Sequence, residues 1–250
     1  MDTNVLQYVE SGSGPLVLLV HGMAGTGATH FQPLIADLAA AGFRAVAPDL
    51  RGHGLSQAFT PHAGLGLFTH HAYDLLALLD RLGAAQAHLI GYSDGGEIAI
   101  ALAGIAPERV ASLCVWGASG RVPPPQIVAL YADPAQRIPN WSEFHVELTA
   151  LHGPDGPKLL QLWAATMVEY AAQGGALNDA EAAKIQCPTL ILAGSNDPFN
   201  PLPAVQALAK RISGARLMVL PAGHDLLAER GTEIATIVRR FLAAEQHQAQ

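Results

Sequence analysis

The sequence has few cysteines, few charged residues and no long run of apolar residues. Its two cysteines, Cys114 and Cys187, are too few for a disulfide framework, and we expect both to be small core residues in a reducing compartment. The longest apolar runs reach about eight residues, short of the ~20 that a membrane helix needs. The chain does not open with the basic and apolar regions of a secretory signal peptide. We therefore expect a cytoplasmic protein with no membrane partner.

Basic residues and metal-binding spacings are scarce as well. Lys and Arg number 14 against 21 Asp and Glu, which gives a formal net charge of −7. No basic stripe is present that could neutralise phosphates, so a nucleic-acid partner is not expected. The 11 histidines include no His-x-x-x-His and the cysteines form no Cys-x-x-Cys, the spacings typical of zinc sites. We expect neither a metal nor a cofactor.

What the sequence does contain is an alternation of apolar, strand-like runs with helix-like segments. Half of the 250 residues are hydrophobic and 14% are charged, as in parallel sheets that are covered on both faces. The alternation predicts such a sheet within one large domain. The expected strands are residues 5–10, 15–20, 44–48, 87–90, 110–116, 188–193 and 216–220. The expected helices are residues 28–41, 69–82, 97–103, 203–212 and 226–244.

The alternation is interrupted in the middle of the chain. From residue 121 to residue 184 there is no strand signal, and residues 159–173 have a helical pattern closed by two glycines. We expect an α/β core of residues 1–120 and 185–250 and a helical insertion of residues 121–184.

The most informative motif is Gly-Tyr-Ser-Asp-Gly at residues 91–95. It lies between the strand-like run 87–90 and the helix-like run 97–103, and a serine on such a tight turn is presented above the sheet as a nucleophile. The bare pattern would occur by chance about 0.1 times in a chain of this composition. Ser93 is therefore the candidate nucleophile, and it needs a histidine as base and an acid to orient that histidine.

Both partners occur downstream, at the ends of predicted strands. Asp197 follows the strand 188–193 and His224 follows the strand 216–220. The order Ser93, Asp197, His224 is that of the α/β-hydrolases and not that of trypsin-like or subtilisin-like proteases. An acid after the strand 110–116 is the other position to consider, but no Asp or Glu occurs between Glu108 and Asp133. Asp225, next to His224, stays open as an alternative acid.

A glycine-rich loop, residues 21–27, follows the second predicted strand. Such a loop lets backbone N–H groups approach a reacting carbonyl oxygen, together with the amide of the residue after the nucleophile. We assign the oxyanion hole to the backbone amides of Met23 and Asp94. The loop has neither the Gly-x-Gly-x-x-Gly nor the Lys-Ser/Thr ending of a nucleotide-binding loop.

These motifs together resemble the α/β-hydrolase superfamily along nearly the whole chain. Residues 49–56 are similar to the loop after that family's fourth strand, and residues 195–198 and 223–224 to its acid and histidine loops. Residues 91–96 and 196–201 are closer still to valacyclovir hydrolase-like esterases. The resemblance implies a mostly parallel central sheet, covered by helices on both faces, with a helical cap over the active site.

The resemblance also implies the chemistry and where to look for the substrate. We expect a serine esterase that cleaves small carboxylic esters through an acyl-enzyme, with Asp94 as a partner for the ammonium of an aminoacyl ester. A lactonase, a cofactor-free haloperoxidase or perhydrolase, a carbon–carbon bond hydrolase and a non-enzymatic ligand receptor are the alternatives. The residues expected to contact the substrate are Gly22, Tyr92, Asp94, Trp116, Trp141, Trp163 and Phe199.

Overall fold

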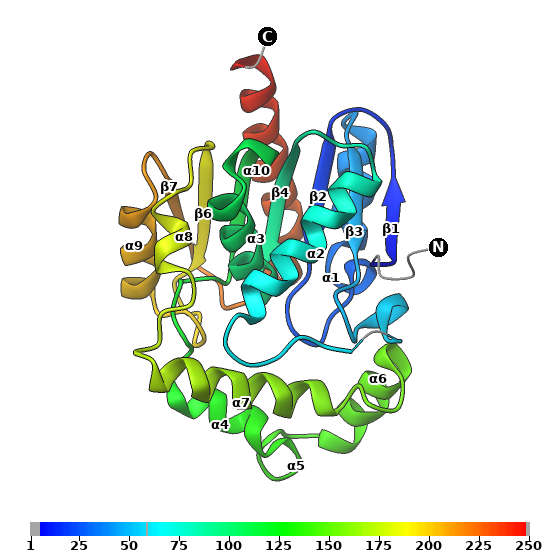
Figure 1. Cartoon of the computed structure of the whole chain (residues 1–250), viewed down its shortest axis with the longest axis vertical. Helices are drawn as coiled ribbons and strands as arrows, with labels where there is room; N and C mark the ends of the chain where they lie inside the picture. Colours follow the sequence, from blue (N-terminus) through cyan, green and yellow to red (C-terminus); the bar gives the residue numbers. More distant parts are fainter. Residues whose placement is uncertain (1–5, 59, 249–250) are drawn as a thin grey trace.

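The centre of the molecule is a twisted sheet with helices on both faces (Figure 1). The computed structural model describes residues 6–58 and 60–248. Within them the chain forms one sheet of seven strands in the order β1-β3-β2-β4-β5-β6-β7, in which β1 is antiparallel to β3 and the other neighbours are parallel. The strands are β1 (Tyr8–Ser11), β2 (Leu16–Val20), β3 (Arg44–Pro48), β4 (Ala87–Tyr92), β5 (Val110–Trp116), β6 (Thr189–Gly194) and β7 (Arg216–Leu220).

The apolar strands are covered on both faces because successive side chains point to opposite sides. Val17 and Leu19 of β2 belong to a core that includes Phe31 of α1, whereas Leu18 and Val20 belong to a second core with α2 and α3. The helices outside the insertion are α1 (Gly27–Ala40), α2 (Leu67–Arg81), α3 (Asp94–Ile105), α9 (Leu202–Arg211) and α10 (Leu226–Gln248), with 3₁₀ turns at Gly54–Ser56 and Pro107–Arg109.

The insertion between β5 and β6 is helical, as predicted. Residues 121–184, called the cap below, are all described and contain no strand, only an isolated bridge between Arg121 and Ala176. In Figure 1 its longer helices lie below the sheet, beyond the ends of the parallel strands. That the cap is a unit separate from the core stays a prediction. Its helices are α4 (Pro125–Ala132), α5 (Pro134–Arg137), α6 (Trp141–His152), α7 (Lys158–Ala172) and α8 (Asp179–Ala182).

The predicted α/β-hydrolase fold is confirmed, with small shifts at the ends of elements. The helix predicted at 69–82 spans Leu67–Arg81, and the one predicted at 226–244 continues to Gln248. The first strand begins at Tyr8, and residue 5, where the prediction starts it, lies outside the described residues.

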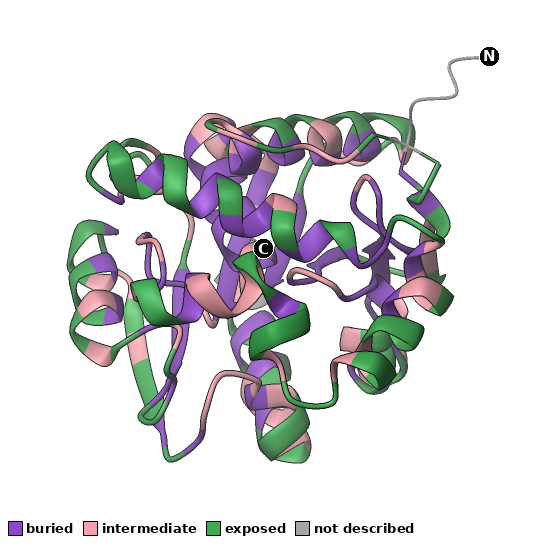
Figure 2. Ribbon diagram, turned by 90° about the horizontal axis from the view of Figure 1, so that it is seen from below, coloured by how far each residue is buried: buried purple, intermediate pink, exposed green. Residues whose placement is uncertain are grey.

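The outer helices turn exposed faces outward and buried faces inward, which Figure 2 shows from the cap side, whereas α3 is buried along residues 95–104. Among the described residues, no helix combines the length and the apolar character that crossing a membrane requires.

Candidate active site

Ser93 sits on a strained turn between β4 and α3. Its φ of 56° and ψ of −124° lie in a region that residues with a side chain seldom occupy. The turn is held by a hydrogen bond of 2.9 Å from the Ser93 amide to the carbonyl oxygen of Trp116. Gly95 has no room for a side chain, because a Cβ there would overlap the backbone of Val20. The glycine lets α3 start against β2, and the strain presents the Ser93 hydroxyl at the sheet edge.

Three loops bring Ser93, His224 and Asp197 together. The parallel strands β4, β6 and β7 end at the same edge of the sheet, and each of these residues follows one of them. Ser93 Oγ lies 3.0 Å from His224 Nε2, and His224 Nδ1 lies 2.9 Å from Asp197 Oδ2. Asp225 instead accepts a hydrogen bond of 3.0 Å from the Ala228 amide at the start of α10. The geometry therefore pairs His224 with Asp197.

The loop after β6 fixes the charge and the position of Asp197. Its Oδ1 accepts hydrogen bonds from the amides of Phe199 (2.8 Å) and Asn200 (3.1 Å). Burial alone would raise the pKa of the Asp197 carboxyl, but the hydrogen bond from His224 and these two amides hold the pKa below its ordinary value. An ionised Asp197 accepts the Nδ1 proton of His224, which leaves Nε2 free to accept the Ser93 hydroxyl proton.

Asn200 is a supporting residue that the sequence did not single out. Its side-chain Nδ2 donates a hydrogen bond of 2.8 Å to the carbonyl oxygen of Gly117, next to Trp116 at the end of β5. The acid loop is thereby tied to the neighbouring strand. The signal was the Asn-Pro pair that closes the loop before α9, but its partner lies 83 residues away in the sequence.

The His224 ring lies between two aromatic side chains. Phe199 stacks on it at 4.3 Å between ring centroids, and Tyr92 lies 5.3 Å away at a tilt. Phe199 also lines the cavity beside Ser93, and its contact with the substrate stays a prediction. Tyr92 does not line that cavity: it is buried, packs on Trp116 and lies beside the His224 ring.

Two tryptophans also lie away from the cavity in which they were expected. Trp116 is fully buried against Phe31 of α1, on the face of the sheet opposite α3. Trp141 begins α6 and packs on Phe144 and His145 within the cap. Trp163 of α7 is the tryptophan that reaches the cavity beside Ser93.

The loop after β2 lies directly against the serine. Gly22 packs so closely that a Cβ there would lie 2.8 Å from Ser93 Cβ. Its amide donates a hydrogen bond of 3.2 Å to Nδ1 of His30, which fixes the turn. The next amide, of Met23, and the Asp94 amide at the start of α3 have no acceptor among the residues that the structure describes. Both residues line the cavity beside Ser93, and the role of their amides as the oxyanion hole stays a prediction.

Asp94 is a half-buried carboxyl group in the cavity wall. Its Oδ1 accepts a hydrogen bond of 3.0 Å from Trp163 Nε1. Burial raises the pKa of Asp94 to about 7, with a smaller contribution from the negative charge of Glu97, while Trp163 lowers it. The site therefore holds a carboxyl that changes charge near neutral pH.

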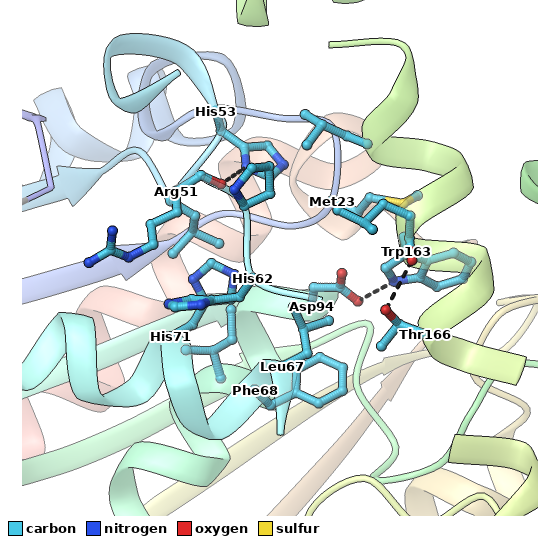
Figure 3. A pocket seen from close by; sticks show the side chains of 15 residues that line it. Met23, Arg51, His53, His62, Leu67, Phe68, His71, Asp94, Trp163 and Thr166 are labelled. Atoms are coloured by element: carbon cyan, nitrogen blue, oxygen red, sulfur yellow. Dashed lines mark hydrogen bonds between the residues drawn. The ribbon is translucent and has the colours of Figure 1, made fainter. Parts of the chain in front are cut away.

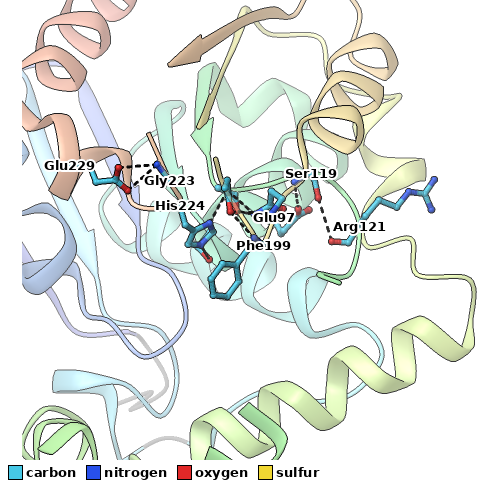
Figure 4. A network of polar contacts seen from close by, with 11 residues as sticks. Glu97, Ser119, Arg121, Phe199, Gly223, His224 and Glu229 are labelled. Carbon is cyan, nitrogen blue, oxygen red and sulfur yellow. Dashed lines mark hydrogen bonds and ion pairs between the residues drawn. The ribbon is translucent and has the colours of Figure 1, made fainter. Parts of the chain in front are cut away.

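Glu97, one turn after Asp94 on α3, also lines this cavity and was not predicted. Figure 4 shows it facing the loop after β5, and its Oε1 accepts hydrogen bonds from the amides of Ser119 (2.9 Å) and Gly120 (2.8 Å). Asn178, at the end of the cap, donates to its Oε2 at 2.7 Å. A charged residue in the apolar run 96–103 was the available signal. Glu97 joins core and cap beside the cavity.

Known proteins share this sequence and architecture. The sequence profile of the Alpha/beta hydrolase family matches residues 17–237. The chain belongs to the α/β-hydrolase family. It is 31% identical to the protein named serine hydrolase BPHL of Mus musculus over 246 residues, covering 95% of this chain and 82% of the relative. The human protein of that name is 29% identical over 242 residues, with the same coverage.

A solved structure agrees with the sequence relatives. A thermophilic esterase from Thermogutta terrifontis superposes on this α/β-hydrolase with a TM-score of 0.76 and 26% identity, covering 96% of this chain and 93% of that one. The predicted superfamily is thus confirmed, and the chain is a hydrolase of that family.

One cluster in this α/β-hydrolase has the composition of a metal site. His62, His71 and Asp74 place ligand atoms within 4.8 Å of one another, although the sequence shows no zinc spacing among them. Arg51 donates hydrogen bonds to both carboxylate oxygens of Asp74, at 2.6 and 2.9 Å. A cation bound here would face the guanidinium group, so the cluster is better suited to the ion pair that it already contains.

Proposed function

We propose that this α/β-hydrolase is a serine esterase that acts on small carboxylic esters through an acyl-enzyme. The observation that supports it is the hydrogen-bonded series from Asp197 through His224 to the hydroxyl of Ser93. The names of the similar proteins, a serine hydrolase and an esterase, support the same reaction class. No metal or cofactor takes part in the proposed steps.

In the first step Ser93 Oγ attacks the ester carbonyl carbon. The hydroxyl proton passes to His224 Nε2, and Asp197 stabilises the imidazolium that forms. The carbonyl oxygen becomes an oxyanion and accepts hydrogen bonds from the amides of Met23 and Asp94. When the tetrahedral intermediate collapses, the C–O bond breaks, and the alcohol leaves with the proton from His224.

In the second step water releases the acyl group. His224 takes a proton from water as the oxygen attacks the acyl carbon, and the proton returns to Ser93 Oγ as the acyl–oxygen bond breaks. The product is the free acid, and the enzyme returns to its starting state.

Asp94 makes aminoacyl esters a favoured substrate class within this proposal. Its carboxyl group borders the same cavity as Ser93, and the cost of burying its charge would be offset by a substrate ammonium. Glu97 adds a second negative charge beside it. A charged group held at such a cost needs a partner, and the described residues provide only the Trp163 hydrogen bond.

The activity can be tested with a fluorophosphonate probe and an ester panel. We expect the probe to label the protein once, at Ser93, because it reacts with activated serines. The panel is p-nitrophenyl esters of increasing acyl length, aminoacyl esters, lactones and a meta-cleavage dienone. Labelling with ester turnover supports the proposal. If the protein is neither labelled by the probe nor active on any ester, the esterase proposal is excluded and a ligand receptor is favoured.

His152 of α6 is expected to position the oxyanion loop. Its Nε2 donates to the carbonyl oxygen of Ala24 at 2.9 Å, and its Nδ1 accepts from the Gly54 amide at 3.1 Å. Ala24 has a φ of 60°, so the loop next to Met23 is held in a strained conformation. Loss of a whole oxyanion donor costs about 10²- to 10³-fold, and a displaced loop should cost less, roughly tenfold in kcat.

The measurement is steady-state hydrolysis of p-nitrophenyl acetate by His152→Ala. The matched control is His145→Ala, on the exposed side of the same helix. We expect kcat to fall in the first variant with little change in KM, and neither to change in the second. Equal kcat values for the two variants would show that the cap contact does not position the loop.

A further inference from the structure

A second cavity adjoins the one beside Ser93. The two share Met23, Asp94 and Trp163 in their walls, but neither Ser93 nor His224 lines the second one. Figure 3 shows this space between the Asp94–Trp163 hydrogen bond and a group of histidines. We call it the histidine cavity; its walls include His53, His62 and His71 and the apolar side chains of Leu50, Leu67, Phe68, Ile98, Leu159 and Leu162.

The histidine cavity has room for part of a ligand. The centres of water-sized molecules can occupy about 40 Å³ of it, whereas one water needs only ~10–15 Å³ by this measure. The apolar walls of the cavity suit a hydrocarbon stem of a ligand, and the histidines form the polar end of the cavity.

Two imidazole nitrogens at the polar end lack partners. His53 Nε2 and His71 Nδ1 are buried and make no hydrogen bond within residues 6–58 and 60–248. His53 Nδ1 lies 2.9 Å from the carbonyl oxygen of Arg51, so Nδ1 carries the proton and Nε2 is an acceptor. Burial lowers the pKa of His53 to about 4 and lowers the pKa of His71 well below its ordinary value. Both rings are neutral near pH 7.

These groups select a neutral ligand with a hydrogen to donate. A carboxylate has no hydrogen for the lone pair of His53 and would lie near the carboxyl of Asp94, and the Arg51 guanidinium that would attract it is already paired with both carboxylate oxygens of Asp74. A metal cation would face the Arg51 guanidinium, which already binds Asp74. A hydroxyl group both donates and accepts, so it can satisfy His53 and the neutral ring of His71 in either tautomer.

The position of the cavity tells which part of an ester enters it. His224 gives its proton to the leaving alcohol, so the alcohol lies on the His224 side of the carbonyl. The histidine cavity instead borders Met23 and Asp94, away from His224. We infer that the histidine cavity is an acyl subsite for an apolar stem that ends in a hydroxyl group. This inference rests on the esterase activity proposed for Ser93.

The test compares two esters of equal size, p-nitrophenyl 3-(4-hydroxyphenyl)propanoate and p-nitrophenyl 3-(4-methylphenyl)propanoate. Sites that hydrogen-bond a substrate hydroxyl discriminate strongly against analogues without it, so we expect kcat/KM to favour the hydroxyl ester by about tenfold or more. His71→Phe and His53→Phe should each bring the ratio close to one. The matched control is His70→Phe, since His70 is exposed and does not line the cavity.

A binding measurement keeps this test separate from the esterase proposal. In Ser93→Ala protein, 4-ethylphenol should shift the ¹⁵N resonances of the His53 and His71 rings, and 4-ethyltoluene should not. If the wild type hydrolyses p-nitrophenyl acetate but shows no preference for the hydroxyl ester, the subsite is excluded. If no ester is hydrolysed, the proposed function fails, and the phenol titration alone decides whether the cavity binds a hydroxyl. Equal responses to both ligands would overturn the inference.

Discussion

Ser93→Ala is expected to abolish ester hydrolysis while the protein stays folded. The methyl group cannot attack a carbonyl, and the small change leaves the hydrogen bond from the residue 93 amide to Trp116 intact. Members of a triad act as a unit, so kcat should fall by about 10⁴- to 10⁶-fold in Ser93→Ala and nearly as far in His224→Ala. The double variant should be little worse than either. The measurement is kcat on p-nitrophenyl acetate, with circular dichroism to verify the fold.

The control for this prediction is Ser213→Ala, at an exposed serine after α9, which should retain full activity. Asp197→Asn tests the acid: an amide at this position favours the wrong histidine tautomer, and the loss should be severe but smaller than for Ser93→Ala. Substantial hydrolysis by purified Ser93→Ala protein would mean that another residue is the nucleophile.

The backbone around Ser93 could be predicted because its signals are local. The motif at residues 91–95 needs only a strand before it and a helix after it, and the fold supplies both as β4 and α3. The places of Asp197 and His224 followed from the ends of two apolar runs, since parallel strands end at the same edge of a sheet. Distances between the three side chains then depend on loops of a few residues.

The places of Tyr92 and Trp116 could not be predicted, because their strands are apolar on both faces. Leu89 and Ile90 of β4 belong to different cores, as do Val115 and Trp116 of β5. A sequence of continuous apolar residues does not show which core each side chain joins. Only the alternation of side chains along each strand places Tyr92 and Trp116 on the side of α1 and α10, away from the cavity beside Ser93.

The roles of His152 and Glu97 could not be predicted for a different reason. His152 contacts Gly54 and Ala24 at sequence separations of 98 and 128 residues, and Asn178 reaches Glu97 across 81. Such contacts depend on how the cap lies against the core, and no local pattern encodes that. Buried polar residues in helices of both parts were the only indication that they would meet.

Asp94→Asn is expected to remove a preference for substrates with a free α-amino group. The comparison uses two esters that differ only in that group. A charge-assisted hydrogen bond from the substrate ammonium to Asp94 predicts a selective loss of ~1.5–3 kcal/mol in transition-state binding, about 10- to 150-fold in kcat/KM. The amide oxygen of Asn can still accept from Trp163, so the wall should persist. Asp155→Asn, at an exposed carboxylate of the cap, is the matched control.

The pH dependence of this preference follows from the charge of Asp94. Burial raises its pKa from 3.8 to about 7, so the carboxylate needed for the pair forms as pH rises through about 7. The substrate ammonium is lost above an α-amino pKa of about 7.7–8.0. The amino ester should therefore be favoured most in a narrow range between these values. The ratio of the two kcat/KM values, measured from pH ~6 to ~9, gives the profile.

The same pKa has a consequence for stability that does not depend on substrate. Between pH 3.8 and about 7 the folded protein keeps a proton on Asp94 that the unfolded chain has lost, so stability falls as pH rises through that window and the cost is complete above it. At ~1.4 kcal/mol per pKa unit this cost is on the order of a few kcal/mol. Asp94→Asn should raise the free energy of unfolding at about pH 8 and change it little at about pH 4.

Asp94→Asn protein that is more stable but no longer prefers the amino ester would mean that the Asp94 carboxyl lowers the stability of the fold and is needed to bind the substrate ammonium. Equal losses of kcat/KM on both esters would instead assign Asp94 to the start of α3 or to the oxyanion loop, where a carboxylate contributes only about 0.3–1 kcal/mol through the helix dipole. In that case the aminoacyl substrate class should be abandoned for a general carboxylesterase. Asp94→Asn and its control Asp155→Asn, each assayed on both esters, separate these outcomes. The gain in stability measures the cost of burying the Asp94 charge, and the selective loss of kcat/KM measures its pairing with an amine.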